Sequence, residues 1–306
     1  MKVSVVIPVF NVACFLPACL DSLMAQTFAD WTCLLVDDGS TDGSAEICLR
    51  YAARDPRLAV RHATNGGAYA ARNVGLAAAD GDAVYFCDAD DILHPELLAT
   101  LASALESAAA DFAYVDADEF PEDGQPVFRP PAAAAEPMED AFPLYVRRTC
   151  GLALWHCLFR RAALAGLVFA EDVRRGADRL FTYEFLRRNP RLARVSAVLY
   201  GYRQRQGSIA HAALDAAAVE GYAKVMRRLA AAYRDDSRLA SLRAGEFVFL
   251  AKYIVRECAR HPELADMPRC REIVGALLSE GVLRLRDFGW RWGWRLFRFA
   301  RKPRVR

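Results

Sequence analysis

Three carboxylates follow a short apolar run in the segment YFCDADD, Tyr85–Asp91. The apolar part is typical of a buried strand, and Asp88, Asp90 and Asp91 come directly after it. If the strand continues, Asp88 and Asp90 point to one side, because strand residues alternate between the two faces. Two such carboxylates are hard oxygen ligands that suit Mg²⁺ or Mn²⁺, with water and a substrate phosphate completing the shell. The alternative is an acidic surface turn without a metal.

Polar residues also follow two earlier apolar runs. Asn11 ends the strand predicted at Lys2–Asn11, and Asp37 and Asp38 follow the strand predicted at Trp31–Val36. The carboxyl ends of parallel strands meet at one edge of a sheet, and ligands bind there. We therefore expect these residues to share one crevice with the acidic segment. The alternative for Asp37 is a purely structural role in the turn.

Strands alternate with helices through the first part of the chain. This order is typical of βαβ units and predicts an α/β fold with a mostly parallel sheet flanked by helices. Further strands are predicted at Leu58–His62, Ala83–Cys87, Phe112–Val115 and from Val195, and helices at Ala13–Phe28, Ala45–Ala53, within Asn65–Asp82 and at Pro95–Ala109. The Pro- and Ala-rich stretch Glu119–Asp140 is predicted to be a mobile loop or linker, and the chain from Ala212 to His261 is predicted to be helical.

Composition limits the class of protein. The chain has 306 residues and a formal net charge of +2, so no overall field favours nucleic acid as a partner. Nine cysteines lack metal-ligand spacing, and the apolar surroundings of Cys33 and Cys87 favour buried reduced thiols. No signal-peptide pattern and no apolar run of about 18 residues is present in this sequence. These features predict a cytoplasmic protein.

Several ordered motifs resemble the family 2 glycosyltransferases, which have the GT-A fold. The motifs are VSVVIPVFN, VDDGSTDGS, NGGAYAARNVGLAAADGD and YFCDADD, and LYGYRQRQGS is similar to the acceptor side of the family. The resemblance covers roughly residues 2–210. It implies a GT-A domain at 1–210 followed by a helical C-terminal region at 211–306. It also implies an inverting transferase in cell-surface polysaccharide assembly that moves a sugar from a UDP-sugar to a glycan or lipid-linked acceptor.

The resemblance assigns roles to particular residues. Pro8, Asn11 and Asp38 would line the nucleotide pocket, with Asp38 on the base, and Arg72 would lie near the base or the diphosphate. Asp88 and Asp90 would flank the ribose and hold Mn²⁺ or Mg²⁺, supported by Asp91.

The catalytic base departs from the family pattern. The family has a Glu-Asp pair before an apolar-Phe pair, but GADRLF places Ala177 where the glutamate is expected. Asp178 remains at the position of the base, and its distance in sequence to Phe181 and Phe169 fits the pattern. A literal Glu-Asp pair at Glu171 and Asp172 is the alternative.

Other functions are weighed against the transferase, and the first of them, a nucleotidyltransferase, is disfavoured. A nucleotidyltransferase would need a glycine-rich loop with an arginine after the first strand, and FNVACF does not provide one. A nucleotide-sugar hydrolase of the same fold is another alternative, and Ala177 keeps open a non-catalytic domain that binds nucleotide sugar or glycan. We expect His156 to be a packing residue, leave His94 unassigned, and leave His211 open as a phosphate or metal contact. Arg203 and Arg205 either meet the diphosphate or acceptor or form a solvated loop.

The C-terminal segment Val282–Arg306 mixes aromatic residues with arginines, and Asp287 is its only acid. Aromatic rings and cations together suit the headgroup region of an anionic membrane. Trp290, Trp292 and Trp294 alternate with other residues and do not trace a clean helical stripe. The alternative is a helix that packs its aromatic residues on the protein. Nucleic acid is not expected as a partner.

Overall fold

The computed structural model describes residues 1–138, 140–147, 153–206, 214–260 and 267–301, which form two compact units. The domain boundary predicted at residues 210 and 211 lies outside the described residues. The first unit comprises Met1–Phe142, Gly151–Glu171 and Glu184–Ser208, and the second comprises Pro143–Cys150, Asp172–Tyr183 and Ile209–Arg306.

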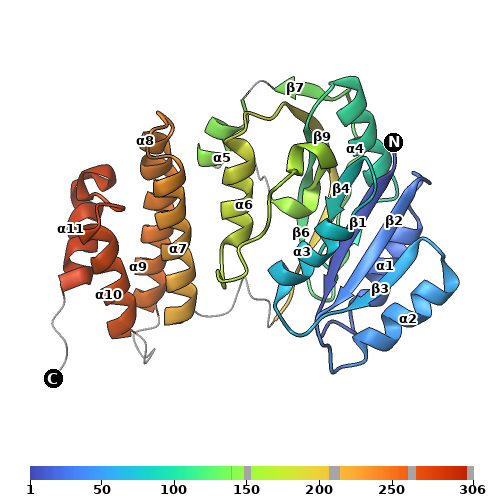
Figure 1. The fold of residues 1–306 in the computed structure, drawn as a ribbon, viewed down its shortest axis with the longest axis horizontal. Helices are drawn as coiled ribbons and strands as arrows, with labels where there is room; N and C mark the ends of the chain where they lie inside the picture. The colour runs from blue at the N-terminus through green and yellow to red at the C-terminus, as the bar shows by residue number, and fades with distance from the viewer. Residues whose placement is uncertain (139, 148–152, 207–213, 261–266, 302–306) are drawn as a thin grey trace. The chain divides into compact units, whose positions relative to one another are not determined.

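The first unit is built on one sheet with the strand order β3-β2-β1-β4-β8-β6-β9-β5, and β7 pairs with β9 (Figure 1). β1 pairs in parallel with β2 and β4, and β2 pairs in parallel with β3. Beyond β4 the sheet is mixed, because β8 runs antiparallel to both β4 and β6. The strands are β1 (Val3–Val9), β2 (Trp31–Asp37), β3 (Leu58–His62), β4 (Ala83–Phe86), β5 (Ile92–Leu93), β6 (Phe112–Pro121), β7 (Glu136–Met138), β8 (Cys157–Arg160) and β9 (Leu192–Gln204).

Both faces of β1 are buried, which explains its nearly continuous apolar sequence. Its odd-numbered residues from Val3 to Val9 belong to a hydrophobic cluster with α1, α2 and α4. Val6 lies on the other face, where α3 approaches it at Gly75. The helices are α1 (Leu16–Met24), α2 (Ser44–Arg54), α3 (Ala68–Ala78) and α4 (Leu97–Ser107), with 3₁₀ turns at Leu154–His156 and Arg161–Leu164.

Two local predictions are corrected in this unit. β4 ends at Phe86, so strand alternation does not reach the aspartates; they form a turn in which the Asp91 amide donates to the Asp88 carbonyl at 3.3 Å. The stretch predicted as a loop at Glu119–Asp140 contains the end of β6 and all of β7. Both strands pair with β9, and this long-range pairing prevails over the local Pro- and Ala-rich composition.

The second unit is helical in its described residues, as predicted from Ala212 onward. α10 lies against α7, α9 and α11. The tail residues Trp290, Trp292 and Trp294 lie on one helix, α11. None of the helices in the described ranges has both the length and the apolar character needed to cross a bilayer. The remaining helices of the described chain are α5 (Phe142–Arg147), α6 (Ala177–Leu186), α7 (Ala216–Ala232), α8 (Leu239–Leu242), α9 (Val248–Arg260), α10 (Met267–Ser279) and α11 (Gly289–Arg301), with a π-helical turn at Arg243–Phe247 and a 3₁₀ turn at Leu285–Phe288. Phe142 of α5 and the last three residues of α6 belong to the first unit.

The expectation of buried cysteines is confirmed for Cys33 and Cys87. The cysteines in the described ranges are free thiols, and Cys14 is the exposed one among them.

Close packing of α3 on β1 gives a first prediction. A Cβ added at Gly75 would lie 2.1 Å from Cγ1 of Val6, so Gly75→Ala should lower the free energy of unfolding by ~1–3 kcal/mol through overpacking. At Gly275 in α10 the nearest atom to an added Cβ is 4.0 Å away. The same substitution there should raise it by ~0.5–1 kcal/mol, because alanine favours helix. Urea unfolding measures both, and a destabilised Gly275→Ala or a neutral Gly75→Ala would contradict the packing.

Candidate active site

The carboxyl ends of β2, β1 and β4 lie side by side at one edge of the sheet. Val9 is level with Asp37 on β2, and Val6 is level with Phe86 on β4. The backbone continues this pairing past the strands, since the Asp38 amide donates to the Val9 carbonyl at 2.9 Å. This edge therefore collects the residues that follow the three strands.

Asp38 follows β2, and its buried side chain contacts the turn that precedes α3. Its carboxylate accepts hydrogen bonds from the amides of Gly66 at 2.8 Å and Gly67 at 2.6 Å. Gly67 has a φ of +87°, which glycine adopts without the strain of a side chain. The Asn-Gly-Gly turn thus presents two consecutive N–H groups to one carboxylate.

Pro8 lies near the end of β1, and Asn11 follows this strand. Asn11 has a φ of +50°, and its Oδ1 accepts from the Thr41 amide at 2.8 Å. The Asn11 amide donates to Ser40 Oγ at 3.2 Å. Pro8 is partly exposed in β1, opposite Val36. These contacts tie the loop after β1 to the loop after β2.

Asp37 points elsewhere and has structural contacts. Its carboxylate accepts from the Ser40 amide at 3.2 Å and lies 3.1 Å from Nδ1 of His62 on β3. Asp37 is buried while the His62 side chain is exposed. These contacts agree with the structural alternative for Asp37.

Each aspartate of the acidic turn has a different partner. Asp88 forms an ion pair with Arg72 of α3, and Asp90 forms one with Arg205. Asp91 accepts from the Tyr200 hydroxyl and from the Arg203 amide, the latter at 2.8 Å. The turn is therefore held from α3 on one side and from β9 and the residue after it on the other.

Arg203 supports this turn from within the protein. Its Nε donates to the Asp90 carbonyl at 2.8 Å and its guanidinium also donates to the Glu122 carbonyl at 2.6 Å. Only 7% of Arg203 is exposed, so the solvated-loop alternative is wrong for this residue. Arg205 is the member of the pair that reaches a carboxylate side chain.

Burial raises the pKa of the Asp91 carboxyl well above its usual value, and the carboxylates of Asp90 and Asp88 raise it further. The hydrogen bonds from Arg203 and Tyr200 act in the opposite direction. Asp91 thus supports the turn from inside, whereas Asp88 and Asp90 keep about a quarter and a sixth of their side chains exposed.

The donor set at this edge fits a Mg²⁺ or Mn²⁺ ion. Asp88 and Asp90 provide hard carboxylate oxygens, and these ions take their other ligands from water and phosphate. No group of three or more His, Cys, Asp or Glu side chains in the described part of the chain could enclose a metal alone. Asp88 and Asp90 are thus the residues of this edge that could hold such an ion.

Asp178 lies in the second unit, in the first turn of α6. Gly176, at a φ of +90°, precedes the helix, and the Asp178 carbonyl accepts from the Thr182 hydroxyl at 2.9 Å. The next residue, Arg179, forms a 2.8 Å ion pair with Glu246, which is 1% exposed in the π-helical turn. Tyr183 also contacts Glu246 at 3.1 Å, so α6 is anchored around Asp178.

The alternative base, Asp172, forms ion pairs with two cationic side chains. Arg228 donates to it at 2.8 Å and Lys224 lies at 3.3 Å. Although partial burial opposes them, these contacts lower the pKa of the Asp172 carboxyl. Glu171 belongs to the first unit and accepts from Asn73 at 2.8 Å.

The predicted packing role of His156 is confirmed. Its ring is 3% exposed and lies 4.6 Å from the Trp155 ring, and Nε2 accepts from the Ala153 amide at 2.8 Å. Burial lowers the pKa of His156 to about 3. His94 accepts from the Glu96 amide at 3.2 Å and contacts the Phe128 ring, while His211 lies outside the described residues.

Tyr200 and the Gly66–Gly67 amides are site components that the sequence did not assign. Tyr200 joins Asp91 to β9, and its hydroxyl also accepts from the Asp88 amide at 3.4 Å. The hydroxyl of a buried tyrosine usually has a hydrogen-bond partner, and this rule is the only sequence signal for the contact of Tyr200 with Asp91.

The chain is similar to a family model and to several known proteins. The family model described as glycosyl transferase family 2 matches residues 4–164. "Uncharacterized glycosyltransferase EpsJ" of Bacillus subtilis is 32% identical over 68% of this chain, and the match spans 62% of EpsJ. "Glycosyltransferase GlyG" of Streptococcus pneumoniae is 38% identical over 36% of each chain. The chain thus spans less than two thirds of the length of these relatives.

Solved structures share the fold. S. aureus TarS 1–349 in complex with UDP-GlcNAc has a TM-score of 0.70 and 23% identity, over 94% of this chain and 83% of TarS. The mannosyltransferase PcManGT of Pyrobaculum calidifontis, in complex with GDP-Man and Mn²⁺, has a TM-score of 0.56 and 19% identity, over 91% and 75%. The predicted GT-A fold is confirmed.

The buried histidine gives a prediction for pH. Its pKa rises from about 3 in the folded protein to its ordinary value of 6.5 on unfolding, so the unfolded chain binds the extra proton. This contribution to stability is present above pH 6.5 and is lost as the pH falls toward 3. His156→Gln should reduce the slope of unfolding free energy against pH in that window by at most ~1.4 kcal/mol per pH unit.

Asp55→Asn is the contrast for this measurement. Hydrogen bonds from Arg57 lower the pKa of Asp55 below 3.8, so its contribution disappears only at lower pH. Urea unfolding across pH should show a change below 3.8 for Asp55→Asn and between 3 and 6.5 for His156→Gln. An unchanged slope in His156→Gln would contradict the assignment.

Proposed function

The chain belongs to glycosyl transferase family 2, and on this premise we propose that it transfers a sugar from a UDP-sugar to a hydroxyl of a glycan or lipid-linked acceptor with inversion at the anomeric carbon. The observation that carries this proposal is the shared edge of β2, β1 and β4, where Asp38 and Asp88 are joined through α3. The matched family region, residues 4–164, contains this edge. Assembly of cell-surface polysaccharide is the setting that we propose.

The nucleotide end of the donor would bind at Pro8, Asn11 and Asp38. Asp38 would contact the base, and the contacts of Asn11 with the loop after β2 keep the pocket wall in place. The UDP-GlcNAc bound by TarS supports a uracil nucleotide.

The diphosphate end would meet the acidic turn. Asp88 and Asp90 would hold Mg²⁺ or Mn²⁺, as the Mn²⁺ in the PcManGT complex supports. The ion would stabilise the negative charge that develops on the leaving diphosphate. Arg72 and Arg205 form ion pairs with these carboxylates. Their guanidinium groups could therefore donate hydrogen bonds to phosphate oxygens of the bound donor.

Asp178 is the proposed base. It would take the proton of the acceptor hydroxyl as the oxygen bonds to the anomeric carbon and the bond to the diphosphate breaks. Asp172 is disfavoured, because a carboxylate paired with Arg228 and Lys224 holds a proton less well. A protein that binds or hydrolyses nucleotide sugars is the second candidate, favoured by Ala177 in place of the expected glutamate.

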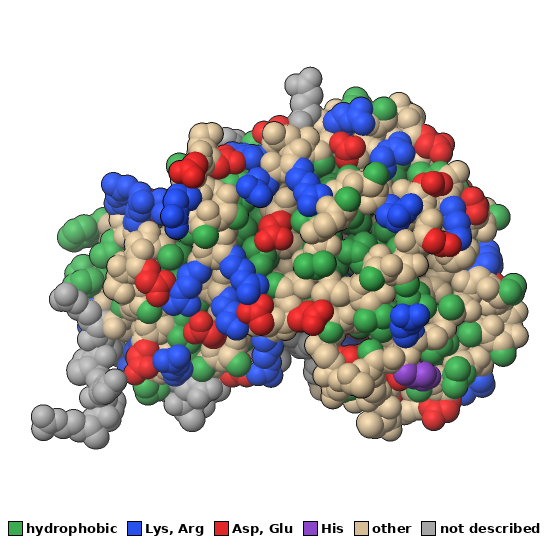
Figure 2. Space-filling model, viewed as in Figure 1, with side chains coloured by type: hydrophobic (Ala, Val, Ile, Leu, Met, Phe, Trp, Pro, Cys, Tyr) green, Lys and Arg blue, Asp and Glu red, His purple; other side chains and the backbone are tan. Residues whose placement is uncertain are grey.

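We also propose a cytoplasmic location at the inner face of an anionic membrane, contacted through residues 282–306. In the described part of this segment, Trp290 is 85% exposed and Trp294 is 51% exposed. Figure 2 shows hydrophobic side chains beside a group of Lys and Arg over α11. Interfacial segments combine these two residue classes.

Asp90→Asn tests the metal carboxylates. It should abolish metal-dependent transfer, because loss of support for the leaving group costs several kcal/mol of activation free energy. Product formation from a panel of nucleotide sugars with Mn²⁺ measures it, and the UDP-sugars should be the donors consumed. Asp116→Asn, which removes a surface partner of Arg194, is the control and should keep wild-type turnover. Full activity of Asp90→Asn, or of the wild type in EDTA, would refute the assignment.

Asp178→Asn tests the base and separates the two candidate functions. It should retain UDP-sugar binding and lose transfer by roughly 10²–10⁴-fold, because the base acts on the acceptor. Asp172→Asn should remain active. If Asp172→Asn is the inactive variant, the base is misassigned; if the wild type only releases free sugar with every acceptor, the hydrolase is correct.

A further inference from the structure

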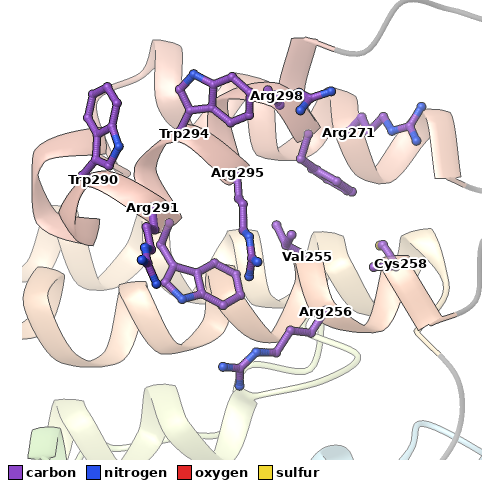
Figure 3. A pocket seen from close by; sticks show the side chains of 12 residues that line it. Val255, Arg256, Cys258, Arg271, Trp290, Arg291, Trp294, Arg295 and Arg298 are labelled. Carbon is purple, nitrogen blue, oxygen red and sulfur yellow. The ribbon is translucent and has the colours of Figure 1, made fainter.

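A pocket of about 850 Å³ lies between α9, α10 and α11 in the second unit (Figure 3). This volume is in the range of ligand pockets. Five arginines line it: Arg256 on α9, Arg271 on α10, and Arg291, Arg295 and Arg298 on α11. None of its lining residues is acidic.

The pocket arginines are not neutralised by carboxylates of the described residues. The nearest acids along the same helices are paired elsewhere: Glu257 with Arg260 and Glu272 with Arg269. Arg271 also has a buried Nε that lacks a hydrogen-bond partner. An unpaired buried donor costs free energy, which an anionic acceptor would recover.

Aromatic rings hold the cations close together in place of carboxylates. Lys252, Arg256 and Arg295 lie 5.4, 5.0 and 5.2 Å from the centre of the Trp292 ring. In Figure 3, Arg295 extends from α11 toward Val255 on α9. Lys252 is not part of the pocket lining, but Arg256 and Arg295 are. These positive charges repel one another, so the site is arranged for a ligand with negative charge.

The other residues that line the pocket are apolar, and they include the exposed side chains of Trp290 and Trp294. Val255 and Phe299 line the pocket together with these two indoles. Arg298 lies 4.6 Å from the Trp294 ring centre and Arg271 lies 5.7 Å from that of Phe299. Inorganic phosphate would use the cations but leave this apolar surface uncovered.

We propose that this pocket binds the phosphate headgroup of one anionic phospholipid, with the start of its acyl chains against Val255, Phe299 and the indoles. The inference deepens the proposed membrane contact of residues 282–306 and rests on it. It adds a defined site to that contact, whereas a diffuse basic surface would bind anionic membranes without saturating at one lipid per chain.

The test uses the full chain and dihexanoyl phosphatidylglycerol below its micelle concentration, with tryptophan fluorescence as the readout. Binding should saturate at one lipid per chain. Arg271→Gln and Arg298→Gln should each weaken it about tenfold or more, as expected for loss of a charge-assisted hydrogen bond. Arg269→Gln, which removes the same charge from α10 outside the pocket, should change the affinity less than about threefold. Urea unfolding of each variant establishes that it is folded.

Three results would overturn the pocket. These are equal losses in Arg269→Gln and the two pocket variants, equally tight binding of inorganic phosphate, and displacement of the lipid by a single-stranded oligonucleotide. Co-sedimentation with vesicles of phosphatidylcholine, alone or mixed equally with phosphatidylglycerol, separates this failure from that of the membrane proposal. Anionic vesicles that bind wild type and Arg271→Gln alike leave the membrane contact standing and refute the pocket; no binding by wild type refutes both.

Discussion

A carboxylate without solvent contact holds the acidic turn in place. Asp91 is fully buried and accepts from Tyr200 and from the Arg203 backbone, more than 100 residues away along the chain. Burying this group is costly unless its oxygens are hydrogen-bonded, and both are. The shape of the turn that carries Asp88 and Asp90 therefore depends on β9, and β9 takes its place through its long pairing with β6.

α3 connects the two halves of the candidate site. The turn before its first residue gives Asp38 two amides, and Arg72, one turn into the helix, meets Asp88. Close approach at Gly75 fixes the same helix on β1. A shift of α3 along the sheet would therefore alter the contacts of both Asp38 and Asp88.

The sequence predicted what depends on local pattern. The predicted bounds of β3, Leu58–His62, are confirmed. The collection of Asn11, Asp38 and Asp88 at one edge follows from parallel strands. The support of the turn by Tyr200 and Arg203 was not predictable, since these contacts join residues distant in sequence. β7 was not predicted for the same reason. Its Pro-containing sequence has no strand pattern, and it is a strand only because it pairs with β9. In the tail, the alternating tryptophans do not show a clear helical pattern, although they lie on α11. The ring of Trp292 contacts Lys252 and Arg256 of α9.

The hydrogen bonds from the Gly66 and Gly67 amides to Asp38 also limit where insertions into the loops are tolerated. The connection from β3 to α3 comprises residues 63–67, and two of its five amides are bound to one side chain. An inserted residue there would move an amide away from its acceptor. Residues 130–134, between β6 and β7, are exposed and carry no such constraint from Asp38. Evolution or a protein engineer can therefore vary loop length between β6 and β7 more freely than at the entrance to α3.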